Sequence, residues 1–558
     1  MKSKLLAFGV AGAAVVAVVV VAFAVGPEHD SHAAVPSTAR SDDGSQTLQQ
    51  AVALSTRLGP LSATAKVQIV LSLRSKREQT LERLFSNGQG ATGSKGSALI
   101  APSTELVRKA LATARAAGFV TAWAPGDAIA SLAGNPKSVQ RLFGVRLSRY
   151  AEPGGGIFFA GDRAPKLPSS LEPVVTGVAG LDDFVQLSPA EVTPGGATPP
   201  DMLKFYDVAP LRAAGLDGSG ETVVLPEAIN PALFATLRSD LARYSTEHGL
   251  PPADISLRAE NRWAPFVSGK DTALTEADLD VDVVHAIAPK AKLIIYPFRA
   301  GNGFIPAEDA AVTENPTGIL SLSYGGCEQA YISSPAFLKA AEQPWLDVAG
   351  ENLSAFGSTG DEGAYRCGQS KGPWIEFPSD TPVLVAVGGT VVFLGKNGSY
   401  GFEMAWGEAL TEWGGGGGVS KLFARPPFQK GAGYPGTKSA PGRLVPDVAA
   451  NAHLGWSIVS GGKDEEVGGT SAAAPFWAGL TALIDQDLVR NHLRRVGVPL
   501  GAFAAIASKH DGAFHDVTAG NNLFYNAGTG WDAATGLGSP DAAILDRDIK
   551  AYIKAGGK

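Results

Sequence analysis

The sequence predicts an α/β protein, in which a large domain with a doubly wound, mostly parallel sheet follows a small α+β domain. The main observation is that short, continuously apolar runs alternate with helix-like stretches beyond residue 200, as in a parallel sheet covered by helices on both faces. The length of 558 residues exceeds one ordinary domain, and 68 glycines and 37 prolines indicate many loops and turns. The net charge of −7 argues against nucleic acid as the main partner.

The first 50 residues are predicted to be an export segment and a linker. Lys2 and Lys4 precede an uncharged apolar run from Leu5 to Val25, in which Ala22-Phe23-Ala24 offers small residues for a signal peptidase. The run is long for a signal, so a cleaved signal peptide and an uncleaved membrane anchor are both consistent with residues 1–25. Residues 26–50 lack periodicity and are interpreted as a linker. We expect the rest of the chain to lie outside the cell, as a monomer.

Residues 51–187 are predicted to form the small α+β domain, of ferredoxin-like type. The pattern indicates a strand, two helices and a hairpin, at Val67–Leu73, Glu105–Ala117, Ser138–Phe143, and Val145–Tyr150 with Ile157–Ala160. Residues 188–200 are rich in Pro, Gly and Thr and resemble an exposed, cleavable connector. The large domain then spans residues 201–558.

The two domains carry opposite charge. Residues 51–180 hold 16 Lys and Arg against 7 Asp and Glu, whereas residues 181–558 have a net charge of −15. This asymmetry favours mutual attraction. If charge holds the domains together, both added salt and low pH should loosen them.

Strands of the large domain are expected within ETVVLPEA, KLIIYPF, GILSLSYG and PVLVAVGGTVV, and helices at Pro335–Gln343 and Ala472–Asp487. In sheets of this kind, functional residues gather at the carboxyl ends of the strands.

The segment Gly468-Gly469-Thr470-Ser471-Ala472-Ala473-Ala474-Pro475 is the most informative one. Ser471 would stand in the first turn of an apolar helix, where free N–H groups favour a developing oxyanion. The simpler interpretation is that Thr470 or Ser471 caps the helix. By itself this segment leaves a nucleophile and a cap equally plausible.

A nucleophilic serine needs a base. Among the eight histidines only His285 has an acidic helical context. The stretch from Thr275 to Asp282 supplies carboxylates instead, and Glu276 and Asp280 are spaced i,i+4 on one helix face. Two carboxylates at that spacing are unfavourable unless they share a proton, which makes an acid/base pair. A solvated acidic helix face is the simpler alternative.

Together these residues resemble the sedolisins, or serine-carboxyl peptidases, which have a subtilisin-like fold and include kumamolisin and tripeptidyl-peptidase. The resemblance implies that Ser471 is the nucleophile, Glu276 its base and Asp280 the residue that orients the base. It matches Gly360-Asp361-Glu362-Gly363 to an oxyanion turn, followed by Phe377-Pro378 and Gly388-Gly389-Thr390. The implied protein is a secreted, acid-acting endopeptidase made as a zymogen and inhibited by its own prodomain.

The role implied for Asp361 has a physical reason. An ionised carboxylate would repel the oxyanion of a tetrahedral intermediate, whereas a protonated one donates a hydrogen bond to it. Such a site favours acid pH. The alternative is an Asx turn in a Gly-rich loop.

The resemblance also implies one structural calcium ion. The expected ligands are the carboxylates of Asp516 and Asp532 and the carbonyls of Val517, Gly528 and Gly530, an all-oxygen set that suits Ca²⁺.

Two segments depart from the family pattern. The Ser-Trp-Gly strand end that lines the substrate cleft is Ser323-Tyr324-Gly325 in this chain, and Tyr324 is expected to contact Glu227. Ser86–Ala98 is Gly- and Ser-rich where family prosegments keep a Tyr-Gly stretch. The only two cysteines, Cys327 and Cys367, follow the cleft strand and the oxyanion turn, and we predict that they form a disulfide.

Three alternatives stay open at this point. One is a subtilisin-type enzyme that uses His285 as base. Another is a tripeptidyl-peptidase of the same family. The third is an inactive, calcium-stabilised binding protein on a peptidase fold, since a fold does not fix a function. All four implied catalytic residues are present, which favours an enzyme.

Overall fold

The computed structural model describes residues 48–92, 96–151, 157–184, 196–258, 273–298, 303–368, 372–431, 433–434 and 440–557. The predicted export segment, nearly all of the linker, and most of the connector at 188–200 lie outside the described residues. No described helix is long and apolar enough to cross a membrane. The chain divides into two units, residues 1–41 and residues 42–558, and only the second is described below.

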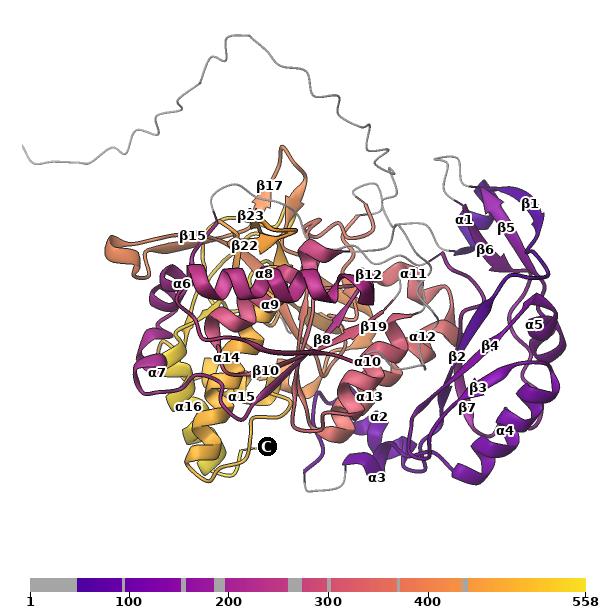
Figure 1. Cartoon of the computed structure of the whole chain (residues 1–558). Helices are drawn as coiled ribbons and strands as arrows, with labels where there is room; N and C mark the ends of the chain where they lie inside the picture. The colour runs from indigo at the N-terminus through magenta and orange to yellow at the C-terminus, as the bar shows by residue number, and fades with distance from the viewer. Residues whose placement is uncertain are drawn as a thin grey trace, which may run out of the picture. The chain divides into compact units, whose positions relative to one another are not determined.

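The large domain is built on an eight-stranded sheet. Seven strands follow the order β16-β15-β13-β11-β8-β10-β9, and β21 also pairs with β15. Their bounds are β8 Thr222–Glu227, β9 Asp254–Leu257, β10 Lys292–Pro297, β11 Ile319–Leu322, β13 Ser354–Ser358, β15 Val385–Phe393, β16 Phe402–Ala405 and β21 Val448–His453. Every pairing is parallel except that of β16 with β15. Figure 1 shows the helices arranged around these strands, which confirms the predicted doubly wound α/β fold.

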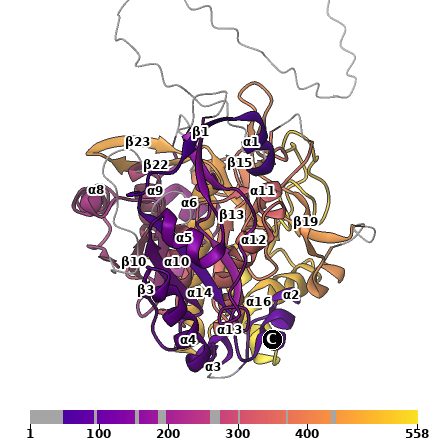
Figure 2. The same cartoon turned by 90° about the vertical axis from the view of Figure 1, so that its right-hand side faces the viewer.

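The small domain has its own sheet and core. Its four-stranded antiparallel sheet has the order β3-β4-β2-β7, with bounds β2 Val67–Leu73, β3 Val120–Ala122, β4 Ile129–Gly134 and β7 Val175–Ala179. Helices α4 (Thr104–Ala116) and α5 (Pro136–Phe143) cover one face of this sheet and share its apolar core (Figure 2). A second sheet joins β1 (Thr56–Pro60), β5 (Leu147–Ala151) and β6 (Ile157–Gly161).

The small domain contacts the large domain through apolar and glycine-rich segments. Strand β7 packs against α12 (Pro335–Ala341), while α2 (Glu78–Ser86) and α3 (Gly96–Ile100) pack against α13 (Gln343–Glu351). The Gly-rich segment that departs from the family pattern lies in this contact. Ala91 N–H donates to Ala349 O at 2.8 Å, and a Cβ added to Gly90 would overlap Asn352. Glycine there allows the two backbones to approach closely.

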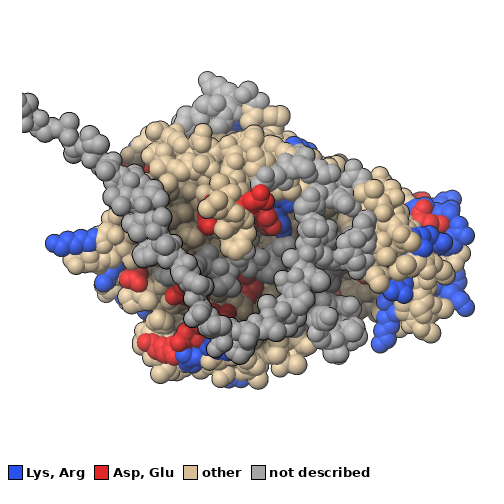
Figure 3. Space-filling view, turned by 90° about the horizontal axis from the view of Figure 1, so that it is seen from above, with Lys and Arg blue, Asp and Glu red and all other residues tan. Residues whose placement is uncertain are grey.

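Direct ion pairs do not account for this contact. Among the described residues, the ion pairs of the small domain join residues within it, namely Arg74–Glu78, Arg146–Asp162 and Arg163–Asp162. Figure 3 shows Lys and Arg gathered at the right-hand end of the face. Close packing therefore holds this contact surface, and the attraction between the two domain charges stays a prediction.

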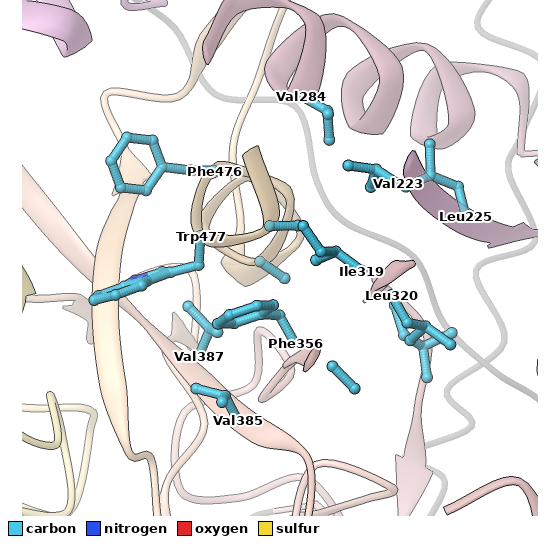
Figure 4. Close-up of a cluster of buried hydrophobic side chains, with 14 of the residues drawn as sticks. Val223, Leu225, Val284, Ile319, Leu320, Phe356, Val385, Val387, Phe476 and Trp477 are labelled. Atoms are coloured by element: carbon cyan, nitrogen blue, oxygen red, sulfur yellow. The ribbon is translucent and has the colours of Figure 1, made fainter. Parts of the chain in front are cut away.

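The long helix α14 (Thr470–Arg490) runs through the core and sets the position of its first residues. It packs against α9 (Leu274–Ile287) and against β11, β13 and β21. Figure 4 shows Phe476 and Trp477 of this helix among sheet residues, and the Trp477 and Phe356 rings are stacked 6.4 Å apart. Because α14 is buried along most of its length, its N-terminus is held rigidly at one end of the sheet.

Candidate active site

Ser471 lies in the first turn of α14, as predicted. The turn begins at Gly469, whose φ of 99° favours glycine, and the alanines after Ser471 keep the helix surface small. Ser471 is 3% exposed, and its hydroxyl donates to Ser323 O at 3.4 Å. Ser323 comes directly after β11, so the serine stands at the carboxyl end of a central strand.

Asp361 lies beside Ser471 in a loop that follows β13. Its Oδ1 accepts hydrogen bonds from the N–H and the hydroxyl of Thr470, both at 2.8 Å. Its Oδ2 is buried and makes no hydrogen bond within the described structure. Burial raises the pKa of Asp361 to about 6, although the two bonds from Thr470 act in the opposite direction. When Asp361 is protonated, it can therefore donate one hydrogen bond through Oδ2.

A third buried carboxyl group, that of Glu227, lies beside the two that the sequence predicts. Glu276 and Asp280 lie one turn apart on α9, both buried. Ser323 Oγ lies 2.9 Å from both oxygens of Asp280, which connects α9 to the strand end beside Ser471. On its other side Asp280 shares a side-chain hydrogen bond with Glu227, the last residue of β8. Such a bond between two carboxyl groups requires a proton.

Burial raises the pKa of both members of the pair. The pKa of Asp280 lies well above its ordinary value, first because of burial and then because of the Glu227 charge. Burial, followed by the charge of Glu276, raises the pKa of Glu227 to about 8. The pair therefore holds its proton throughout the acid range.

The predicted cleft residues Ser323, Tyr324 and Gly325 have different surroundings in the structure. Ser323 lines the pocket beside Ser471. Tyr324 is buried, and its hydroxyl donates to Glu227 Oε2 at 3.1 Å, the contact expected from the sequence. Gly325 packs so closely on Glu376 that a Cβ would overlap the carboxyl group.

A small pocket opens beside the nucleophile and contains a buried ion pair. It is lined by Ser323, Ser358, Gly360, Asp361, Glu362, Arg366, Glu376, Thr470 and Ser471. Arg366 is almost fully buried and pairs with Glu376 and Glu362. It also donates to Gly325 O at 3.0 Å. The Cys327–Cys367 disulfide, with Cα atoms 5.2 Å apart, lies next to Arg366 and joins the two loops of the pocket wall.

The described residues that line this pocket include no histidine. His285 lies in the last turn of α9, nine residues and about 13.5 Å along the helix from Glu276. Its Nε2 lies 3.0 Å from both Ser245 Oγ and Pro251 O. Burial lowers the pKa of His285 to about 4. His285 is therefore part of the packing between α9 and α8 (Phe234–Glu247).

The residues predicted to bind calcium converge in one C-terminal loop cluster. Gly530 N–H donates to both oxygens of Asp516, at 3.1 and 2.9 Å. Gly528 N–H donates to Asp532 Oδ2 at 2.9 Å, and Thr535 Oγ1 lies 3.5 Å from Val517 O. No group of three or more His, Cys, Asp or Glu suited to a metal occurs in the described part of the chain. Two carboxylates with backbone carbonyls still form a hard, all-oxygen donor set that fits Ca²⁺.

Sequence reasoning missed Arg366 and Glu376, and it gave Thr470 no role beyond capping. Arg366 had one available signal, because it directly precedes a cysteine expected to be bridged beside the oxyanion turn. Glu227 also had a signal, since a carboxylate that ends an apolar strand run stands at the functional edge of a parallel sheet. Glu376 and Thr470 offered none, because their roles depend on contacts with residues far away in the sequence.

Comparisons with known proteins agree with this geometry. Residues 53–184 match the family model described as "Pro-kumamolisin, activation domain". Kumamolisin of Bacillus sp. (strain MN-32) is 31% identical over 451 residues, which cover 75% of this chain and 77% of that protein. Tripeptidyl-peptidase 1 of Bos taurus is 26% identical, over 68% of this chain and 71% of its own. A structure of Pseudomonas sedolisin, described as a serine-carboxyl proteinase, matches with a TM-score of 0.56 and 28% identity, over 66% of this chain and all of that one.

The fold, the nucleophile helix and the activation domain define a serine-type peptidase made as a zymogen. The chain belongs to the sedolisin family of serine-carboxyl peptidases, with kumamolisin among its relatives.

Proposed function

We propose that this protein is a secreted, acid-acting endopeptidase that cleaves peptide bonds through an acyl-enzyme on Ser471. The observation that carries the proposal is the arrangement of Ser471 and Asp361 around one pocket, with Asp280 of α9 connected to it through Ser323. Export is inferred from the sequence of residues 1–25 alone. Digestion of a peptide library by the mature enzyme tests the proposal and defines its substrate preference.

In the proposed reaction Ser471 Oγ attacks the carbonyl carbon of the peptide while Glu276 takes the hydroxyl proton. Asp280 holds Glu276 in position. The carbonyl oxygen becomes an oxyanion, which accepts a hydrogen bond from protonated Asp361. When the C–N bond breaks, Glu276 returns the proton to the leaving amine. Water then hydrolyses the ester on Ser471 by the same proton transfers.

Acid action follows from the titration of Asp361 in this scheme. Asp361 is a donor below its pKa of about 6 and loses that proton as the pH rises further. The Asp280–Glu227 pair keeps its proton over the same range, because the pKa of Glu227 is raised to about 8, and it therefore does not oppose activity in acid. Activity is therefore highest in acid and falls toward neutral pH.

The zymogen is proposed to process itself. Ser471→Ala should fold but keep its prodomain, whereas the wild type should yield a mature form of about 40 kDa, from some 360 residues of ordinary mass. The measurement is electrophoresis of the purified proteins after incubation at pH 4. A mature form that arises from pure Ser471→Ala at the wild-type rate would contradict self-processing.

One Ca²⁺ is proposed to bind at Asp516, Asp532 and the carbonyls of Val517, Gly528 and Gly530. The ion would stabilise the C-terminal loops, because ligand at about 100 times its Kd adds about 2.7 kcal/mol to the free energy of unfolding. Chelation should therefore lower the Tm of Ser471→Ala protein, and added Ca²⁺ should restore it. Asp516→Asn is the matched control: its Tm should already be low and should not respond to chelator. If the chelator did not change the Tm of the Ser471→Ala protein, the calcium site would be contradicted.

A further inference from the structure

Thr470 precedes the nucleophile and joins the two loops that build the pocket. Its side chain is fully buried, and its hydroxyl takes part in two hydrogen bonds. Gly360 N–H donates to Thr470 Oγ1 at 3.1 Å, and Thr470 Oγ1 lies 2.8 Å from Asp361 Oδ1. The backbone N–H of Thr470 also donates to Oδ1, at 2.8 Å.

The direction of these bonds follows from the groups themselves. A backbone N–H can only donate, so the Thr470 oxygen accepts from Gly360. The hydroxyl proton of Thr470 is then available to Asp361 Oδ1, which receives two donors in all. An oxygen that accepts two donors acts as the carbonyl oxygen of a carboxylic acid. The acid proton of Asp361 must then lie on Oδ2, the oxygen without a hydrogen bond in the described structure.

We propose that Thr470 is a positioning residue whose hydroxyl selects the oxygen of Asp361 that carries the proton, and thereby directs this donor at the oxyanion. The inference rests on the proposed role of Asp361 as oxyanion donor and adds a second residue to it. Without the hydroxyl, the backbone N–H alone holds Oδ1. The carboxyl group can then rotate or carry its proton on the wrong oxygen.

The charges around Asp361 give this proposal a distinctive pH signature. Besides burial and the Thr470 bonds, the charge of Glu362 raises the pKa of Asp361 and the charge of Arg366 lowers it, while burial raises the pKa of the nearby Glu376 to about 8. The hydroxyl bond from Thr470 lowers the pKa of Asp361. Removing it should raise that pKa, so Asp361 stays protonated to a higher pH. The variant should be slower at every pH and yet have its alkaline limb at a higher pH, a combination that general damage to the fold would not produce.

The test compares Thr470→Val and Thr470→Ser with the wild type. Each variant is made as the full chain and, where it matures slowly, processed by tagged wild-type enzyme that is then removed. Measurements are kcat and KM on one peptide from pH 3 to 8. We expect Thr470→Val to lower kcat roughly 10–100-fold with little change in KM, because misplaced catalytic groups cost about this much. The alkaline limb of its pH profile should move to higher pH. Thr470→Ser should restore both the wild-type kcat and the wild-type position of this limb.

Thr481→Val is the matched control, since Thr481 is a buried threonine on the same helix, three turns further on. It should leave the profile unchanged. A Thr470→Val enzyme with wild-type kcat and an unmoved limb would overturn the proposal, as would Thr470→Ser behaving like Thr470→Val. If Thr470→Val does not fold, Thr470→Ala is judged by the same criteria.

Asp361→Ala, measured in parallel, distinguishes the proposed role of Asp361 as oxyanion donor from the proposed role of Thr470 as its positioning residue. If Asp361→Ala keeps wild-type activity, the proposed role of Asp361 fails. If Asp361→Ala is inactive while Thr470→Val is normal, the inference about Thr470 alone fails.

Discussion

Asp361→Asn is expected to keep appreciable activity and to move the alkaline limb of kcat/KM upward, whereas Asp361→Ala should lose about 10²–10³-fold at all pH values. An asparagine amide donates a hydrogen bond at every pH, but the wild-type carboxyl donates only while protonated, below a pKa of about 6. The local geometry suits the amide, since its oxygen can take the place of Oδ1 and accept from Thr470. The remaining NH₂ then takes the place of the acid proton.

The profile is measured on mature enzyme with calcium present. The Asp280–Glu227 pair limits this upward shift only above neutral pH, because the pKa of Glu227 is raised to about 8 and that of Asp280 also lies well above its ordinary value. Equal inactivity of the Asn and Ala variants would remove Asp361 from its proposed role. So would an Ala variant nearly as active as the wild type.

Glu276→Gln is expected to lower kcat/KM by about 10²–10⁴-fold, the usual contribution of a general base. The amide keeps the size and burial of the side chain but cannot accept the proton of Ser471. His285→Gln should stay close to wild-type activity, because His285 packs against Ser245 and Pro251 at the far end of α9. The measurement is kcat/KM at the wild-type optimum, with Tm recorded to confirm that both variants fold.

This pair of variants also decides the main alternative. A subtilisin-type enzyme with a histidine base predicts the reverse pattern, in which His285→Gln is inactive and Glu276→Gln is active. Loss of activity in neither variant would show that another group takes the proton.

Much of the fold could be predicted because it depends on local pattern. The apolar run of β8 and the spacing of α4 place these elements within a residue or two of their observed bounds. The site residues Ser471, Glu276, Asp280 and Asp361 could be placed because each lies in a short motif of recognisable order. Residues in one helix turn, such as Glu276 and Asp280, need no tertiary information to be brought together.

The rest depends on contacts between distant segments. Nothing near Asp280 in the sequence indicates that Glu227, from another strand, shares its proton. The Arg366–Glu376 pair likewise forms only when two loops close on one pocket. The glycines near residue 90 were interpreted as an irregular departure from the family, whereas the structure shows a close approach of two backbones. Charge counts predicted attraction between the domains, but not that their contact surface is apolar and tightly packed.

The most direct test of the central claim is to locate the nucleophile and its base in a single labelling experiment. Mature enzyme at acid pH is treated with a serine-reactive fluorophosphonate, and the adduct is mapped by mass spectrometry. The account predicts one adduct, on Ser471, formed at the wild-type rate in His285→Gln and far more slowly in Glu276→Gln. An adduct on another residue, or undiminished labelling of Ser471 in Glu276→Gln, would contradict a serine nucleophile served by a carboxylate base.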